Sequence, residues 1–347
     1  MSATILISGI GGSIGIDVAR SLRRDSSLRL VGTDANPWAQ RQTVGLVDRS
    51  VLLPRADRQP EAYHRSLCEL IAEESVDFAF VNPDPELEGL AGMRATLPCP
   101  TSMPPIDTVA VSLDKASTVA RVGQDDAFPA TLALDGDDVE ADVRRAFDTL
   151  GAPLWIRARV GASGRGSLTV ETPAEALAWI AYWNSRGKEY GWVLAEFLPG
   201  ANINWTGLYV EGELRVSAAM ERLRYFLGAA AASGVSGQVA QCATVAPEPY
   251  REVCDRVIRA LDDRPHGLYS VDLRHDRDDR ARVTEVNPRL AGRPWLYTNA
   301  GVNLALAAAR ALTGQDIGDA VGADGLAVGM QLYRQLDIEP VVGFPES

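Results

Sequence analysis

The N-terminal segment contains the pattern that most restricts the fold of this chain. Thr4 to Ser8 are largely apolar or β-branched and predict a buried strand, and the glycine-rich run from Gly9 to Gly15 predicts a tight turn. A helix is expected over Ile16 to Arg23 and a second strand over Leu28 to Asp34. A strand, glycine turn, helix and returning strand are typical of a parallel sheet with helices on both faces.

The same alternation continues to about residue 110 and predicts a Rossmann-like N-terminal lobe over residues 1–110. A small α+β lobe is expected over 111–200 and a second α+β lobe over 201–347. Three parts suit a chain of 347 residues, which is more than one hydrophobic core usually organises. Further strands are expected at 50–53, 76–81, 153–157, 167–171, 192–197, 204–210, 213–219, 268–275 and 281–286, and helices at 60–74, 113–122, 135–150, 173–186, 247–261 and 303–312.

The charge balance restricts the partners of the protein. Its 34 lysines and arginines against 46 aspartates and glutamates give a net charge of −12, which provides no long-range attraction to nucleic acid or to anionic lipid. The only lysines are Lys115 and Lys188, so a catalytic lysine would have to be one of these two. We expect small-molecule substrates, no nucleic-acid or membrane partner, and an assembly that could be a homodimer.

The cysteines and the N-terminus indicate a cytoplasmic location. Cys68, Cys99, Cys242 and Cys254 are scattered without the spacing of a zinc site and predict reduced thiols. The apolar N-terminal stretch has no basic residues before it and is interrupted by glycines, so we expect neither a signal peptide nor a membrane span.

The first glycine turn allows two interpretations. Asp34 ends the second strand where the ribose-binding acid of a dinucleotide site would lie, which favours an NAD(P)-dependent oxidoreductase. However, Ile14 occupies the position of the third glycine, which arrives one residue late at Gly15. The alternative is a tight turn in a lobe that binds no dinucleotide.

A second glycine loop, Gly161 to Gly166, lies between two expected strands. Its flexible backbone could close over phosphate groups with its N–H groups, or it could be a plain glycine-rich hairpin. Arg157 lies on the strand that leads into this loop, and its guanidinium could hold a phosphate with two hydrogen bonds.

Three oxygen-bearing side chains converge on one predicted hairpin. Glu285 and Asn287 are two residues apart on a strand and therefore share a face, and Asp272 is expected opposite them on the neighbouring strand. Ligands that are all hard oxygens suit Mg²⁺, which completes its shell with waters and substrate phosphates. The alternative is a solvated acidic hairpin, which the asparagine and the nearby Arg289 make less attractive.

These motifs, in this order, resemble those of the ATP-grasp superfamily, specifically the carbamoyl-phosphate-synthase-like carboxylate–amine ligases. The resemblance covers about residues 1 to 315, and its most specific part is the run Glu285-Val286-Asn287-Pro288-Arg289. The supporting segments are an acidic turn at 82–88, a helix start at 112–115, the strand and loop at 153–166, a hinge at 193–200 and a helix start at 300–304.

The resemblance implies an ATP-grasp fold, a Mg²⁺·ATP site and a role for each matching residue. Lys115 and Arg157 would contact ATP phosphates and act in catalysis with Arg289, which would hold the γ-phosphate and the acyl phosphate. Asn202 stands where the family usually has a ribose-binding glutamate. The glycine loop (Ser163, Gly164, Gly166) would cover the phosphates, the hinge (Glu196, Phe197, Leu198) would meet the adenine edge, and Asp272, Glu285 and Asn287 would bind Mg²⁺.

Arginines after these motifs suggest where a second substrate binds. Arg222 and Arg224 would share one face of a strand and grip a carboxylate or phosphate, or else lie on a solvated strand edge. Arg293 would add to this anion pocket, and Trp295 would form part of its wall.

The reaction expected from the resemblance is an ATP- and Mg²⁺-dependent ligation of a small carboxylate to an amine. It would pass through an acyl phosphate and release ADP and phosphate. The carboxylate or its partner would be an amino acid or a related metabolite, because an arginine-rich pocket suits a small anion. A catalytically weak nucleotide-binding member of the same fold is the alternative besides the oxidoreductase.

Overall fold

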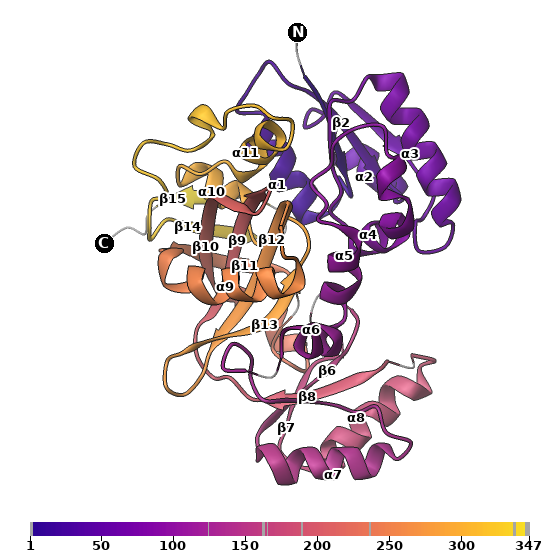
Figure 1. Cartoon of the computed structure of the whole chain (residues 1–347), viewed down its shortest axis with the longest axis vertical. Helices are drawn as coiled ribbons and strands as arrows, with labels where there is room; N and C mark the ends of the chain where they lie inside the picture. The colour runs from indigo at the N-terminus through magenta and orange to yellow at the C-terminus, as the bar shows by residue number, and fades with distance from the viewer. Residues whose placement is uncertain are drawn as a thin grey trace.

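The computed structural model describes residues 3–123, 125–161, 164, 166–188, 190–235, 237–335 and 338–343. Its strands form one parallel and two antiparallel sheets, so the expected α/β class is confirmed. In Figure 1 an N-terminal lobe lies at the upper right, a lid lobe at the bottom and a C-terminal lobe at the left. The boundaries at residues 110 and 200 stay a prediction.

The N-terminal lobe is built on a parallel sheet with strand order β3-β2-β1-β4. The turn between β1 and α1 needs its glycines, because a Cβ on Gly15 would lie 2.4 Å from the carbonyl oxygen of Gly9. The elements are β1 (Thr4–Ser8), α1 (Ser13–Leu22), β2 (Arg29–Asp34), α2 (Pro37–Gln42), β3 (Arg49–Leu52), α3 (Pro60–Glu74), β4 (Phe78–Phe80) and α4 (Asp84–Leu90).

Two short helices lead from this lobe to the lid, α5 (Ile106–Leu113) and α6 (Lys115–Val122). The sequence predicted one helix over Leu113 to Val122, which is wrong at its start. The Asp114 side chain accepts hydrogen bonds from the backbone N–H groups of Ala116 and Ser117, so it ends one helix and caps the next.

The lid lobe has an antiparallel sheet with strand order β5-β8-β6-β7, packed against two helices. Apolar side chains of both helices and of the strands form its own hydrophobic cluster. The elements are β5 (Thr131–Ala133), α7 (Val139–Leu150), β6 (Leu154–Ala158), β7 (Leu168–Val170), α8 (Pro173–Ser185) and β8 (Trp192–Glu196).

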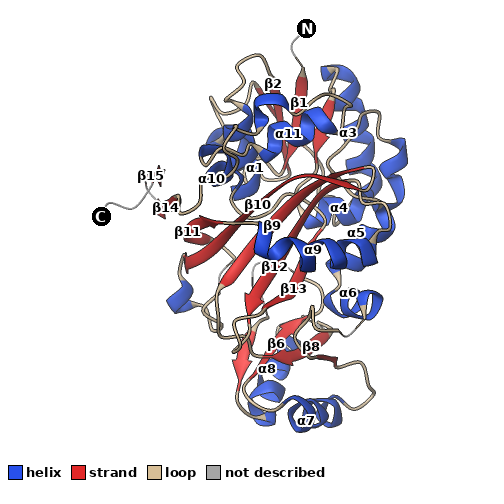
Figure 2. Cartoon of the chain, turned by 60° about the vertical axis from the view of Figure 1, so that its left-hand side comes forward, coloured by secondary structure: helices blue, strands red, loops and turns tan. Residues whose placement is uncertain are grey.

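The C-terminal lobe has an antiparallel sheet of seven strands in the order β13-β12-β9-β10-β11-β14-β15. Figure 2 shows α9 across one face of these strands and the lid lobe below their ends. The elements are β9 (Asn202–Val210), β10 (Glu213–Tyr225), β11 (Val239–Val245), α9 (Glu248–Leu261), β12 (Gly267–His275), β13 (Ala281–Asn287), α10 (Pro294–Asn299), α11 (Leu304–Ala311), β14 (Gln331–Gln335) and β15 (Ile338–Gly343).

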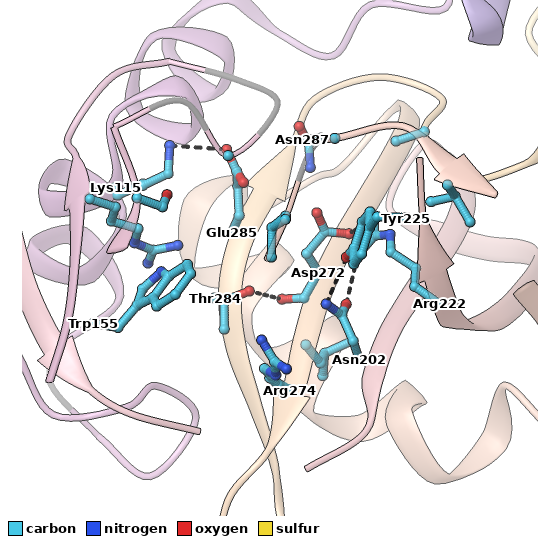
Figure 3. Close-up of a pocket in the computed structure, with 18 of the residues that line it drawn as sticks. Lys115, Trp155, Asn202, Arg222, Tyr225, Asp272, Arg274, Thr284, Glu285 and Asn287 are labelled. Carbon is cyan, nitrogen blue, oxygen red and sulfur yellow. Dashed lines mark hydrogen bonds and ion pairs between the residues drawn. The ribbon is translucent and has the colours of Figure 1, made fainter. Parts of the chain in front are cut away.

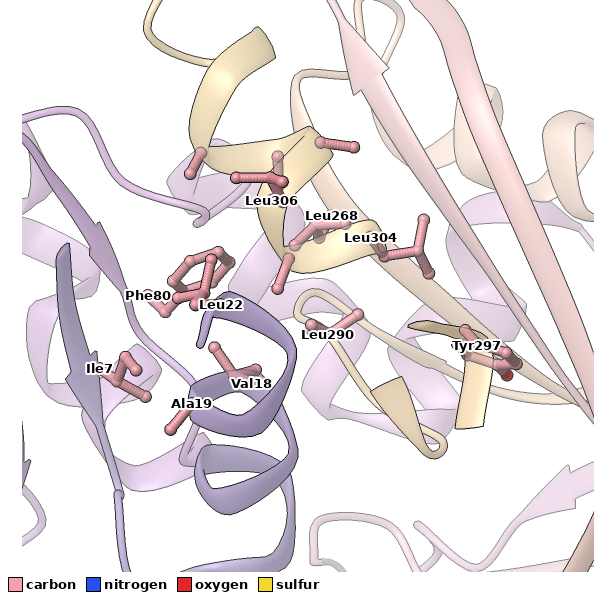
Figure 4. Close-up of a cluster of buried hydrophobic side chains, with 14 of the residues drawn as sticks. Ile7, Val18, Ala19, Leu22, Phe80, Leu268, Leu290, Tyr297, Leu304 and Leu306 are labelled. Atoms are coloured by element: carbon pink, nitrogen blue, oxygen red, sulfur yellow. The ribbon is translucent and has the colours of Figure 1, made fainter. Parts of the chain in front are cut away.

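One hydrophobic cluster joins the first and last parts of the chain. Helix α1 lies between the parallel sheet and the C-terminal helices α10 and α11, and its buried face contributes Val18, Ala19 and Leu22 (Figure 4). The same cluster contains Ile7, Phe80, Leu268, Leu290, Tyr297, Leu304 and Leu306. Helix α1 is thereby held against the helices of the C-terminal lobe. Among the described residues, no helix is both long and apolar enough to cross a membrane.

Candidate functional site

A cavity of about 310 Å³ lies where the three lobes meet. Side chains and backbone from α1, α6, the lid strands, the hinge and the long C-terminal strands line it (Figure 3). Although the chain is strongly acidic, the described lining residues include more cations than carboxylates, so the cavity suits an anionic ligand. The cations are Lys115, Arg157, Arg222, Arg274, Arg289 and Arg293, and the carboxylates are Glu196, Asp272 and Glu285.

The predicted metal-binding side chains gather on the β12–β13 hairpin. The register places Asp272 opposite Glu285, and Figure 3 shows both side chains on the same side of the sheet as Asn287. No group of three or more histidine, cysteine, aspartate or glutamate side chains in the described part of the chain could hold a metal ion. Two carboxylates and one amide are hard oxygen ligands, so this set fits Mg²⁺ that also binds substrate oxygens.

Lys115 is brought to these carboxylates by the helix break at Asp114. Its Nζ lies 3.1 Å from an oxygen of Glu285 and donates a hydrogen bond to the carbonyl of Gly161 in the lid loop. Arg159 donates hydrogen bonds to the Asp114 carboxylate from the strand side. Burial raises the pKa of Asp114, but the hydrogen bonds from Arg159 and Ser117 outweigh it and lower this pKa. The cap that positions Lys115 is therefore anionic and rigidly held.

Arg157 is a buried cation of the cavity that forms no ion pair among the described residues. Its side chain is only 9% exposed, and its Nε has no hydrogen-bond partner among the described residues. Burial lowers the pKa of its guanidinium, and the charges of Glu285 and Asp272 only partly oppose this. A buried guanidinium with unused donors suits an oxyanion such as a phosphate.

A network of polar side chains surrounds Asp272. One oxygen of this carboxylate accepts hydrogen bonds from Arg222 at 2.6 Å and from Asn204 at 2.7 Å. Arg222 also donates to the side-chain oxygen of Asn202, whose amide nitrogen donates to the hydroxyl of Tyr225. Asn202 stands at the position of the expected ribose-binding acid. Both its side-chain oxygen and its side-chain nitrogen are thus engaged in hydrogen bonds.

The hinge, which the sequence predicted to meet a nucleobase, forms one wall of the cavity. Glu196, Phe197 and Leu198 all line the cavity, together with Trp155 from β6 and Arg274 from β12. Arg274 donates a hydrogen bond to the carbonyl of Gly200, and burial lowers its pKa. An indole and a guanidinium are both suited to stacking on a planar ring.

Two further arginines lie at the end of the cavity nearest the N-terminal lobe, and each is paired with an acid of that lobe. Arg289 forms an ion pair with Asp84 at the start of α4. Arg293 forms an ion pair of 2.7 Å with Asp17 of α1, and both side chains are almost fully buried. These pairs join the loop after β13 to the first lobe.

Solved structures with the same architecture are numerous, although no protein-family model and no curated protein matches the chain by sequence. The biotin carboxylase domain of 2-oxoglutarate carboxylase from Hydrogenobacter thermophilus, solved with MgADP and bicarbonate, superposes with a TM-score of 0.70 at 14% identity over 95% of this chain and 73% of that one. N5-carboxyaminoimidazole synthetase from Staphylococcus aureus, solved with ADP, gives 0.70 at 14% identity over 97% and 83%. L-amino acid ligase from Bacillus licheniformis gives 0.67 at 16% identity over 95% and 78%.

The chain has the ATP-grasp fold. The expected architecture is confirmed: the parallel sheet is the N-terminal lobe of this fold, the small antiparallel sheet is its lid, and the seven-stranded sheet is its C-terminal lobe. At these identities the likeness establishes the architecture, and the chemistry has to be argued from the residues.

Some predicted residues lie outside the cavity of this ATP-grasp fold. Arg224 is exposed and does not line it. The prediction that Arg222 and Arg224 share a face is wrong because β10 continues through them with a bulge: Arg222 pairs with Cys242 and Arg224 with Gln241, which are neighbours on β11 and face opposite sides.

Trp295 and Gly166 also do not line the cavity. Trp295 packs on the joint hydrophobic cluster and stacks with Arg24, because its place in α10 turns it toward α1. Gly166 lies near Ala158 and Trp192 within the lid. Gly164 does line the cavity with a positive φ of 66°, while Ser163 lies outside the described residues.

Several residues of the site were not predicted from the sequence. Trp155 could have been found, because it stands two residues before Arg157 on the same strand and so shares its face. Tyr225, Asn204 and Arg274 carried no motif, and they enter the site only through strand pairing.

Proposed function

We propose that the protein is an ATP- and Mg²⁺-dependent carboxylate–amine ligase that forms an acyl phosphate and releases ADP and phosphate. The observation that carries the proposal is the meeting of Lys115 and Arg157 with Asp272, Glu285 and Asn287 in one cavity of the fold. The solved structures with ADP bound, named above, support it as neighbours of the same architecture.

In this proposal the lid side of the cavity holds the nucleotide. Lys115 and Arg157 would donate hydrogen bonds to phosphate oxygens, the hinge from Glu196 to Leu198 would border the base, and Asp272, Glu285 and Asn287 would hold Mg²⁺. When bound, Mg²⁺ would neutralise charge on the phosphate oxygens. Lys115 now pairs with Glu285, and this pair would exchange partners as the nucleotide enters.

The chemical step would be an attack of a substrate carboxylate on the γ-phosphoryl group. The cationic side chains would orient the reactants and absorb negative charge, so no covalent enzyme intermediate is required. Arg289, which Asp84 holds in place, would face the acyl phosphate until an amine displaces the phosphate. The substrate would be a small carboxylate, an amino acid or a related metabolite, because the lining is rich in arginine.

The geometry of the first glycine turn argues against the oxidoreductase. The Asp34 carboxylate accepts hydrogen bonds from the backbone N–H groups of Gly11 and Asn36, so its oxygens are engaged within the turn. Pro83 also packs closely against the turn, since a Cβ on Gly9 would lie 2.4 Å from its side chain. A dinucleotide would have to displace these contacts.

A product assay tests the proposed reaction. Pools of amino acids and small carboxylic acids are screened with Mg²⁺ and ATP, with hydroxylamine as the trapping amine, and products are identified by mass spectrometry. The expected result is ADP, phosphate and a hydroxamate, each dependent on the acid. AMP and pyrophosphate, or phosphate release that no acid stimulates, would refute the ligase; the second result would indicate an uncoupled ATPase or a nucleotide-binding protein.

The Glu285→Gln variant connects this reaction to the site. It removes one charged metal ligand and keeps the side-chain shape, so acid-dependent ADP release should fall by at least about 100-fold. Its melting temperature should stay close to that of the wild type. Asp278→Asn, in the exposed turn of the same hairpin, is the matched control and should keep full activity. Substantial activity in Glu285→Gln would contradict the metal assignment.

A further inference from the structure

A polar side chain lies inside the C-terminal sheet, beside the proposed metal site. Asn204 of β9 is fully buried and does not line the cavity. Burial of an amide costs free energy unless its oxygen and its nitrogen both find hydrogen-bond partners. The partners of Asn204 therefore indicate what its side chain does.

The amide of Asn204 has one defined orientation. Its Oδ1 accepts a hydrogen bond of 3.2 Å from the hydroxyl of Tyr297, and its Nδ2 donates one of 2.7 Å to Oδ1 of Asp272. A flipped amide would turn its oxygen to the Asp272 carboxylate, and two acceptors would then face each other. Gly292 leaves room for this arrangement, because a Cβ at that position would lie 2.2 Å from Oδ1 of Asn204. Asn204 is thus fixed as a donor to Asp272.

The donors to the Asp272 side chain come from one side only. Arg222 of β10 donates to the same oxygen, Oδ1, at 2.6 Å. In the sheet order β13-β12-β9-β10, Asn204 and Arg222 lie on the β9 side of Asp272, whereas Glu285 lies on the β13 side. Figure 3 shows Arg222 and Glu285 on opposite sides of the Asp272 side chain. No donor of a described residue engages Oδ2, so this second oxygen of a cavity-lining carboxylate is available to a ligand.

We propose that Asn204 is a positioning residue for the metal site, because it holds Oδ1 of Asp272 on the β9 side and so leaves Oδ2 free to bind Mg²⁺ together with Glu285. Loss of a hydrogen bond that orients a metal ligand typically weakens metal binding by about 10- to 100-fold. Arg222 holds the same oxygen, but it also lines the cavity and can meet a substrate there. Asn204 does not line the cavity and acts through Asp272. The inference rests on the proposed function, which supplies the nucleotide and the metal.

The affinity of a metal ion for the protein–ADP complex measures this role. Mn²⁺ accepts the same oxygen ligands as Mg²⁺ and is detected by electron paramagnetic resonance, so it is titrated into the full chain with ADP. Asn204→Ala removes the donor to Asp272. Thr244→Val is the matched control, because Thr244 is buried in the same sheet and its hydroxyl donates to the carbonyl of Ala327, away from the cavity.

Asn204→Ala should weaken Mn²⁺ binding to the protein–ADP complex by at least about tenfold, while its affinity for ADP in EDTA should stay within about twofold of the wild type. Thr244→Val should match the wild type in both measurements, although it also loses a buried hydrogen bond. Equal Mn²⁺ affinities in Asn204→Ala and the wild type would overturn the inference. An equal loss of ADP affinity without metal would also overturn it, because the residue would then have only a structural role.

Tyr297→Phe tests the same inference if Asn204→Ala does not fold. It removes only the hydroxyl that fixes the amide, so Mn²⁺ binding should weaken by roughly two- to tenfold. An unchanged Mn²⁺ affinity in this variant would overturn the inference. Failure of the proposed function appears in the wild type instead: if its ADP complex binds Mn²⁺ no more tightly than free ADP does, the metal site is wrong and the inference falls with it.

Discussion

The two ends of the cavity carry cations in different states. At the lid end, Arg157 is buried with no carboxylate in hydrogen-bond contact among the described residues, and Lys115 pairs with a carboxylate that is itself a proposed metal ligand. At the end nearest the N-terminal lobe, Arg289 and Arg293 are each paired with an acid from that lobe. Cations of one cavity can therefore have separate tasks: those at the lid end are available to a ligand, while those at the other end also hold two lobes together.

The largest expected effect is at the paired end. Arg293→Met removes the ion-pair partner of the buried Asp17, so the free energy of unfolding should fall by about 3–5 kcal/mol. Urea denaturation measures this loss. Adding Asp17→Asn should restore much of the stability, because it removes the stranded charge. If Arg293→Met alone is as stable as the wild type, the pair does not join the lobes.

A smaller effect is expected at Glu86, an acid of the first lobe near this end. Burial raises its pKa to about 7, and hydrogen bonds from Ser8 and Tyr63 offset only part of this. The folded chain therefore keeps a proton that an unfolded glutamate loses near its usual pKa of 4.5. The free energy of unfolding should fall by about 3 kcal/mol as pH rises from about 4.5 to 7, and this contribution should be constant above that.

The Glu86→Gln variant checks this pH dependence. Since glutamine stays neutral, its free energy of unfolding should exceed that of the wild type at pH 8 and differ little at pH 4.5. Glu69→Gln, on an exposed position of α3, should follow the wild type at both pH values. Parallel pH profiles for Glu86→Gln and the wild type would show that Glu86 ionises normally.

The lid end should respond in ligand affinity and not in stability. Arg157→Met removes a donor to phosphate and should weaken binding of MgADP by about 1.5–3 kcal/mol, or roughly 10- to 150-fold, by calorimetry. The ligand-free protein should be no less stable, because the substitution also removes a desolvated charge. A loss of stability like that of Arg293→Met would remove the contrast between the two ends.

The two lysines of the chain provide the narrowest test. Lys115→Met should weaken MgADP binding by the same range or less, since Lys115 must first leave Glu285. Lys188→Met is the matched control, because Lys188 is exposed in the loop after α8 and lies outside the cavity. Equal affinities for the two variants would show that Lys115 does not contact the nucleotide.

Short-range patterns in the sequence were enough to predict helices and strands and part of the site. The two-residue period of a strand placed Glu285 and Asn287 on one face, and a hairpin placed Asp272 opposite Glu285, as the register shows. The glycine turn after β1 and the alternation of strands and helices predicted the parallel sheet. These features depend only on neighbouring residues, which is why the sequence contained them.

Strand pairing and lobe packing decided the rest. A bulge in β10 sends Arg222 into the cavity and Arg224 to the surface, and the strands β11, β14 and β15 had no strong local signal. Arg289 meets Asp84, 205 residues away, and Arg293 meets Asp17, 276 residues away. Local periodicity cannot specify such partners, because register, burial and charge pairing across lobes are set by how whole elements pack. Residue identity along the chain shows which side chains could do chemistry, whereas the packing of the lobes selects which arginines pair with acids and which keep free donors for a ligand.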